Sequence, residues 1–323
     1  MKSDHFTHTA DDGVELFVYR WKPDYEIGKG VVQIAHGLAE HAGRYERLAE
    51  ALTDQGYQVY AGDHRGHGRT ARDQRDLGYF GDRDGWNRVV QDLMEIATAA
   101  KSASPGIPIT LFGHSMGTLM AQQAIYQYPD LYDAVALSGA NGKVGFLVQL
   151  GRIIARIERL RLGRHGRSDI INGMSFGTFN KAYAPNRTAF DWLSRDESEV
   201  DKYIADPNCG FVATTQLWVD MLDAIPRVVR RENWSRIRHD LPIYLFSGRN
   251  DQVNDNGLGC EFLAESYREF GLKNISYRVY PGARHETLNE LNLDEVTEHI
   301  VEWLECLRAV KKNEEGRMKN AEL

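Results

Sequence analysis

Cysteine is scarce in this chain of 323 residues, which contains only Cys209, Cys260 and Cys306. Their number is odd and their spacing is wide, whereas disulfide frameworks and zinc sites use paired cysteines at short intervals. We therefore predict free thiols, no metal site, and a cytoplasmic location, where thiols stay reduced.

Long hydrophobic runs and an excess of basic residues are missing as well. The chain begins without an apolar stretch behind a basic residue, and no segment approaches the roughly 18 consecutive apolar residues that span a membrane. Lysine and arginine number 39 against 46 aspartates and glutamates, so the net charge is −7. We expect no secretion signal, no membrane span and no nucleic-acid partner, because phosphate binding requires a basic face.

What the chain does contain is a regular alternation of short apolar runs with helix-length segments. Strands are expected on both sides of the turn Asp11-Asp12-Gly13 and at 31–35, 57–61, 109–112, 134–138, 243–247 and 277–280. Helices are expected at 45–55, 86–100, 115–127, 257–270 and 293–310. This order predicts an α/β fold with a mostly parallel central sheet and helices on both faces.

The alternation stops between residues 141 and 238, where the strand pattern is absent. We predict a core domain formed by residues 1–140 and 239–310, an inserted helical cap at 141–238, and a charged, frayed tail at 311–323.

The first helix of this cap is expected to be amphipathic and basic. Apolar residues recur at helical spacing: Phe146, Leu147, Leu150, Ile153, Ile154, Ile157 and Leu160. Arginines are frequent between residues 143 and 167, against Glu158 as the one acid. The favoured interpretation is that the apolar face packs on the core and the arginines face solvent; transient contact with an anionic membrane surface is the alternative.

A catalytic motif stands at residues 113–117, Gly-His-Ser-Met-Gly, between an expected strand and an expected helix. A nucleophile on such a tight turn needs small neighbours, which Gly113 and Gly117 supply. The turn exposes Ser115 and leaves backbone N–H groups free at the start of the helix. We predict that Ser115 is the nucleophile.

A serine hydroxyl needs a base, and the base needs an acid that orients it. Asp251 follows the expected strand at 243–247, and His285 follows the one at 277–280. This order of serine, acid and histidine along the chain is the one that hydrolases with such a turn use. We predict that Asp251 and His285 complete a catalytic triad.

The developing oxyanion requires hydrogen-bond donors, and we predict the backbone N–H groups of Leu38 and Met116. His36 and His41 are expected to hold the loop after the strand at 31–35 in shape. His64 and His67 lie in a Gly-rich turn at 63–68, which we interpret as an internally hydrogen-bonded loop rather than a metal site.

The segments 36–45, 63–68, 113–117 and 281–286, together with Asp251, resemble the monoacylglycerol lipase and lysophospholipase branch of the α/β-hydrolases, also described as serine aminopeptidase-like. The resemblance covers nearly the whole chain outside the cap. It implies the α/β-hydrolase fold, a mobile cap over an acyl pocket, and substrate-binding roles for Glu40 and Arg44 at the glycerol end of the site. Thr70 stands where the family commonly has serine.

The expected activity is hydrolysis of a carboxylic ester through an acyl-enzyme, as in a monoacylglycerol lipase or lysophospholipase, without a cofactor. Three alternatives stay open: a small-ester carboxylesterase, a serine aminopeptidase that binds the substrate ammonium with an acid of the cap, and a non-catalytic ligand-binding module. The complete triad argues against the last of these. The expected partner is a small acyl ester or lipid. The physiological substrate and the oligomeric state do not follow from the sequence.

Overall fold

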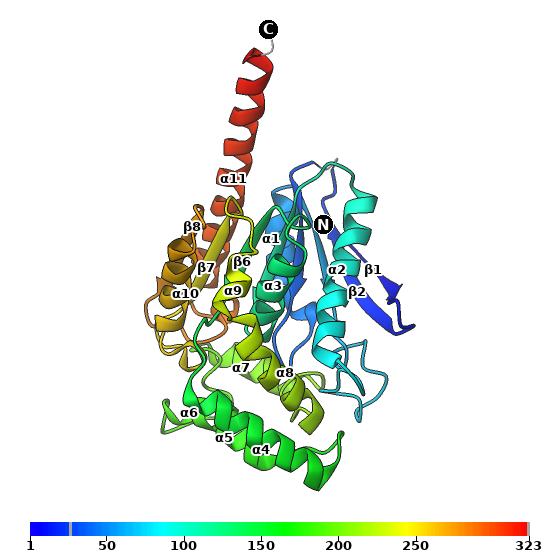
Figure 1. Ribbon diagram of the computed structural model, residues 1–323, viewed down its shortest axis with the longest axis vertical. Coiled ribbons are helices and arrows are strands. Elements are labelled where there is room, and N and C mark those ends of the chain that lie inside the picture. Colours follow the sequence, from blue (N-terminus) through cyan, green and yellow to red (C-terminus); the bar gives the residue numbers. More distant parts are fainter. Residues whose placement is uncertain (26–27, 322–323) are drawn as a thin grey trace.

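The computed structural model describes residues 1–25 and 28–321 and is built around one eight-stranded sheet (Figure 1). The strands follow the order β1-β2-β4-β3-β5-β6-β7-β8. Their bounds are β1 Lys2–Thr9, β2 Glu15–Lys22, β3 Gly30–Ala35, β4 Tyr57–Gly62, β5 Ile109–His114, β6 Ala134–Ser138, β7 Ile243–Gly248 and β8 Ile275–Tyr280. β2 runs antiparallel to β1 and β4, and the remaining pairs are parallel.

Two hydrophobic cores lie on opposite faces of this sheet. Along β3, the side chains of Val31 and Ala35 join one core, whereas those of Val32 and Ile34 join the other. The first core is closed by α2 (Gly85–Ala103), α3 (Met116–Gln127) and α10 (Leu258–Glu269), and the second by α1 (Glu46–Asp54) and α11 (Leu293–Ala321). The predicted α/β architecture is therefore confirmed.

The predicted end of the last helix at residue 310 is wrong. α11 continues to Ala321 and extends beyond the body of the protein (Figure 1). Lysine, arginine, glutamate, methionine and alanine, which favour helix, make up most of this stretch and outnumber Asn313, Gly316 and Asn320.

Residues 141–238 form helices and loops, as the sequence predicts, and hold no strand longer than an isolated bridge between Arg167 and Thr214. The helices are α4 Phe146–Leu162, α5 Asp169–Met174, α6 Phe176–Lys181, α7 Glu197–Ala205, α8 Thr215–Val228 and α9 Arg231–Trp234. α4, α5 and α6 lie at the end of the molecule opposite the projecting part of α11, with α7 and α8 next to them, whereas α9 lies closer to the middle of the molecule (Figure 1). Their role as a separate cap stays a prediction.

The favoured interpretation of α4 is wrong, because most of its apolar face points to solvent. Phe146, Leu147, Ile153, Ile157 and Leu160 are between 56% and 85% exposed. Ile154, by contrast, packs against the first core, and Ala155 is buried. α4 packs against α8, and there Arg152 and Arg156 both pair with Asp223, at 2.9 and 2.6 Å. Helical periodicity reveals that a helix has an apolar face but not which way that face points.

Among the described residues, no helix combines the length and the apolar character that crossing a bilayer demands.

Candidate active site

Ser115 occupies the sharp turn between β5 and α3, in a backbone conformation with φ 51° and ψ −116°. The flanking glycines are needed for this turn, because a Cβ on Gly117 would lie 2.1 Å from the carbonyl oxygen of Ala35 and one on Gly113 would lie 2.7 Å from that of Gly117. Ser115 is half-buried, and its hydroxyl forms no hydrogen bond within residues 1–25 and 28–321. The hydroxyl is therefore available to a substrate.

His285 and Asp251 form a buried hydrogen-bonded pair after the last two strands of the sheet. Nδ1 of His285 donates to both carboxylate oxygens of Asp251, each 2.9 Å away, and the two side chains are 2% and 0% exposed. The N–H of Val253 donates to the same carboxylate at 2.9 Å. This arrangement fixes the ring and leaves Nε2 as the lone-pair nitrogen of a neutral imidazole.

The electrostatics of His285 favour its charged form. Burial disfavours the imidazolium and acts to lower the pKa, but the charge and hydrogen bond of Asp251, with Glu286 and Glu40, outweigh burial and raise the pKa of His285 above its ordinary value. A base of this kind accepts the serine proton and then holds the positive charge beside Asp251.

The serine turn and the histidine meet at the end of β6. The N–H of Ser115 donates to the carbonyl of Ser138 at 2.9 Å. The next residue, Gly139, is so close to the pair that a Cβ there would lie 3.1 Å from Cε1 of His285. The ring of His114, beside the serine, lies 4.9 Å from the ring of His285. The structure thus brings the three predicted residues to one edge of the sheet.

The loop after β3 faces the serine. A Cβ on Gly37 would lie 3.3 Å from Cβ of Ser115 and 2.8 Å from Oε1 of Glu40, so the glycine allows a close approach of this loop to the serine. Within the described part of the chain, the N–H groups of Leu38 and Met116 donate to no protein acceptor. Their roles as oxyanion donors stay predictions, and the free N–H groups beside the serine are the geometry those roles require.

Histidines hold this loop together, as the sequence predicts. His36 donates from Nδ1 to the carbonyl of Gly37 at 2.8 Å and accepts the N–H of His64 at 3.0 Å. His64 donates to the carbonyl of His36, and His67 to that of Arg65. Burial lowers the pKa of His64 to about 3 and that of His67 to about 4, so both rings are neutral at physiological pH.

Glu40 and Arg44, predicted to bind substrate, are engaged with the protein itself. Glu40 accepts the N–H of Gly37 at 2.6 Å and the hydroxyl of Tyr45 at 2.9 Å. Arg44 joins Glu40 to Glu286, with N–O distances of 2.7 Å to each carboxylate. A contact of either residue with substrate stays a prediction.

Two contacts of the site were missed by sequence reasoning. Glu286 directly follows the predicted base His285 in the sequence, and this position was the only hint that Glu286 belongs to the site. The ring of Trp192, from the loop before α7, lies 5.2 Å from the ring of His285, and the backbone N–H of Glu286 donates to the carbonyl of Leu193 at 2.8 Å. No local pattern singles out Trp192, because its partner is far away in the sequence.

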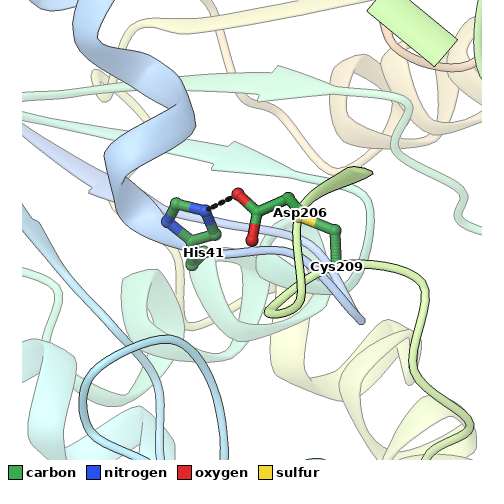
Figure 2. Close-up of side chains that lie close together, drawn as sticks. All are labelled: His41, Asp206 and Cys209. Carbon is green, nitrogen blue, oxygen red and sulfur yellow. Dashed lines mark hydrogen bonds and ion pairs between the residues drawn. The ribbon is translucent and has the colours of Figure 1, made fainter. Parts of the chain in front are cut away.

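A second link between core and cap is formed by His41, Asp206 and Cys209 (Figure 2). Nε2 of His41 donates to Asp206 at 2.9 Å, while its Nδ1 accepts the N–H of Gly43 at 3.2 Å. The three side chains offer metal-ligand atoms within 4.8 Å of one another. However, an ion there would have to displace the proton on Nε2 of His41 and the thiol proton of Cys209. Burial raises the pKa of the Cys209 thiol, so this thiol holds its proton more firmly than usual. We therefore interpret His41 and Asp206 as a hydrogen-bonded link rather than as metal ligands.

The sequence matches known proteins over most of its length. Residues 27–292 match the model of the serine aminopeptidase S33 family. The chain is 29% identical to the monoacylglycerol lipase of Mycolicibacterium smegmatis over 304 residues, which covers 90% of this chain and 95% of that protein. It is 28% identical to the monoglyceride lipase of Mus musculus over 295 residues, or 90% and 85% of the two chains.

Solved structures have the same fold. A carboxyl esterase from Bacillus coagulans in complex with glycerol superimposes with a TM-score of 0.87 at 24% identity, covering 95% of this chain and 99% of that one. A monoglyceride lipase variant from Saccharomyces cerevisiae in complex with a substrate analog gives a TM-score of 0.76 at 20% identity, with 95% of each chain covered. Because the family model spans most of the sequence and the sheet carries its serine turn at the expected edge, the chain belongs to the serine aminopeptidase S33 family of α/β-hydrolases.

Proposed function

We propose that this protein is a serine hydrolase that cleaves single-chain acyl esters, as a monoacylglycerol lipase or lysophospholipase does. The observation that carries the proposal is the buried His285–Asp251 pair, which shares one edge of the sheet with the strained turn of Ser115. Such a constellation serves acyl transfer.

In the proposed mechanism, Oγ of Ser115 attacks the ester carbonyl while Nε2 of His285 takes its proton. The N–H groups of Leu38 and Met116 stabilise the oxyanion, and Asp251 stabilises the imidazolium. His285 then returns the proton to the leaving alcohol. Water attacks the acyl-enzyme by the same route, which releases the fatty acid and restores Ser115.

The proposed substrate class rests on the relatives and on the cap. The two relatives above are named as lipases of monoacylglycerols. Aromatic side chains of the cap form a layer beside the base: Phe176 stacks on Trp192 with 5.5 Å between ring centroids and lies 6.0 Å from Trp218. An apolar wall of this kind favours an acyl chain, since each buried methylene adds about 0.8 kcal/mol.

The test is kcat/KM across acetyl to palmitoyl esters of p-nitrophenol and glycerol, with lysophospholipids and alanine and proline aminoacyl amides in parallel. We expect kcat/KM to rise with chain length and then fall once the pocket is full. A steady preference for acetyl esters would instead indicate a small-ester carboxylesterase. Faster cleavage of the amides would indicate an aminopeptidase, and failure to react with a fluorophosphonate probe would indicate a binding module.

We also propose that α4 makes transient contact with an anionic membrane surface. The apolar stripe of α4 is exposed, and Arg159, Arg161 and Arg164 belong to the same basic segment. Apolar side chains enter the headgroup region while arginines attract anionic lipids. This contact would bring the enzyme to the surface where single-chain lipids reside.

The test is sedimentation with vesicles of phosphatidylcholine and phosphatidylserine. Ile153→Ser with Ile157→Ser should lower the bound fraction several-fold. Leu258→Ser is the matched control, because Leu258 is a 45% exposed apolar residue on α10, outside the cap. Equal binding of both variants would contradict the proposal.

A further inference from the structure

We propose that Glu40, Arg44 and Glu286 form a positioning clamp that ties the oxyanion loop to the loop of the catalytic histidine and supports the charge on that histidine. This inference rests on the proposed function of Ser115 and His285. It assigns the three residues a role in placing the catalytic groups, in addition to any contact with substrate.

On one side, the clamp holds the oxyanion loop. Oε1 of Glu40 accepts the N–H of Gly37 at 2.6 Å, directly before the proposed donor Leu38. Ala39 follows with a left-handed φ of 59°, a conformation that requires support in a residue other than glycine. The bond from Gly37 to Glu40 closes this tight turn and thereby orients the N–H of Leu38.

On the other side, the clamp holds the histidine loop. Arg44 donates to both oxygens of Glu286 at 2.7 Å, a two-pronged geometry that fixes the angle between the two groups. One of its nitrogens also donates to Glu40 at 2.7 Å. Asn289 donates to Glu286 at 2.9 Å and so completes the shell. Because Glu286 is bonded to His285 through the backbone, a shift of Arg44 would move the base relative to the oxyanion donors.

The clamp is buried and carries two carboxylates for one guanidinium. The side chains of Glu40, Arg44 and Glu286 are 4%, 12% and 7% exposed. The titratable groups that face His285 are Asp251, His114, Glu286 and Glu40, and Trp192 covers the ring from the cap. Both glutamates act on the pKa of His285 in the same direction as Asp251, upward. The clamp thus favours the imidazolium that forms during acyl transfer.

Positioning and charge can be separated by two substitutions. Arg44→Lys keeps the positive charge but loses the two-pronged contact with Glu286. We therefore expect kcat to fall about 10-fold or more, while the acid limb of the pH profile stays at the same pH as in the wild type. Glu286→Gln keeps the shape but removes a negative charge. We expect it to move the acid limb of kcat/KM to lower pH by about half a pH unit or more.

Glu290→Gln is the matched control, because Glu290 is a fully buried carboxylate of the same loop that pairs with Arg195 at 2.8 Å. A merely structural role of Glu286 predicts that both substitutions reduce activity and leave the acid limb unmoved, which would overturn the proposal. Glu40→Gln provides a second test of the same downward movement if the Glu286 variant does not fold.

NMR titration of the His285 ring gives a reading that needs no substrate. The pKa of the His285 ring should be lower in the Glu286→Gln variant than in the wild type and unchanged in the Glu290→Gln variant. If the wild type fails to hydrolyse esters while this difference persists, the proposed function is wrong and the clamp holds. If esters are hydrolysed and the two variants titrate alike, the clamp is wrong.

Discussion

At the scale of single residues, Ser115 combines exposure to substrate with a backbone angle that side chains rarely adopt. Its φ of 51° is maintained by glycines on both sides and by the hydrogen bond from its N–H to Ser138. The side chain itself contributes little to packing, because the hydroxyl has no partner in the described part of the protein. Function and stability are therefore separable at this position.

Ser115→Ala should abolish esterase activity and fluorophosphonate labelling, with a loss in kcat on the order of 10⁴ or more. The midpoint of thermal unfolding should stay within a few degrees of the wild-type value, since alanine, like serine, carries a Cβ and is strained to the same degree by the positive φ at this position. Retention of near wild-type turnover would show that another residue is the nucleophile.

His285 should impose an acid limb on the pH dependence of kcat/KM. Only the neutral ring accepts the serine proton, and the pKa of the ring is raised above 6.5 by the carboxylates around it despite burial. Activity should therefore be full well above this pKa and decline as pH falls through it. Asp251→Asn removes the strongest supporting charge, so the limb should move to lower pH while kcat drops steeply. A flat profile between pH 5 and 8 would contradict the assignment.

At the scale of elements, the loop after β3 is held by the cap as well as by the core. His41 binds Asp206, which follows α7, and the N–H of Gly210 in the same cap loop donates to the carbonyl of Ala39 at 2.9 Å. Tyr203 of α7 donates to that same carbonyl at 2.8 Å. Any movement of the segment that contains Tyr203, Asp206 and Gly210 would thereby be coupled to the loop after β3.

His41→Ala should loosen this connection. Loss of a partly buried hydrogen bond costs about 1 kcal/mol, so we expect amide hydrogen exchange at Gly210 to accelerate roughly fivefold. His239→Ala is the control, because His239 is exposed and lies at the other end of the core. If Gly210 exchanges at the same rate in both variants, the link from His41 to Asp206 contributes nothing to holding the cap.

At the scale of the whole molecule, cap and core are joined at separate places by backbone hydrogen bonds. Gly210 reaches Ala39, Thr214 donates to the carbonyl of Gly78 at 3.1 Å, and Glu286 donates to that of Leu193. Aromatic contacts add to these bonds, such as the tilted contact of Trp192 with His285, with 5.2 Å between ring centroids. A cap attached on several sides has few ways to unfold alone.

We therefore expect a single cooperative transition in scanning calorimetry, with a ratio of calorimetric to van't Hoff enthalpy of about 1. An independent cap would show itself as an earlier transition carrying roughly a third of the total enthalpy, in proportion to its length. The Ser115→Ala variant should unfold in the same single transition, because the substitution removes catalysis and leaves the contacts between cap and core unchanged.

The sequence alone determined the central sheet, its covering helices and the three residues proposed for the triad. These features depend on local chemistry and on order along the chain: apolar runs of strand length, glycines around Ser115, and loops that must begin where β7 and β8 end. In a parallel sheet, the carboxyl ends of the strands meet at one edge, so residues placed after them converge without any knowledge of packing.

Only the tertiary structure decided the direction of α4 and the partners of the buried charges. Periodicity defines an apolar face of α4, but the competition between that face and the ion pairs of Arg152 and Arg156 with Asp223 is settled by packing against α8. Likewise, Arg44 and Glu286 are 242 positions apart in the sequence. No local pattern links them, because an ion pair requires proximity in space and the fold alone supplies it.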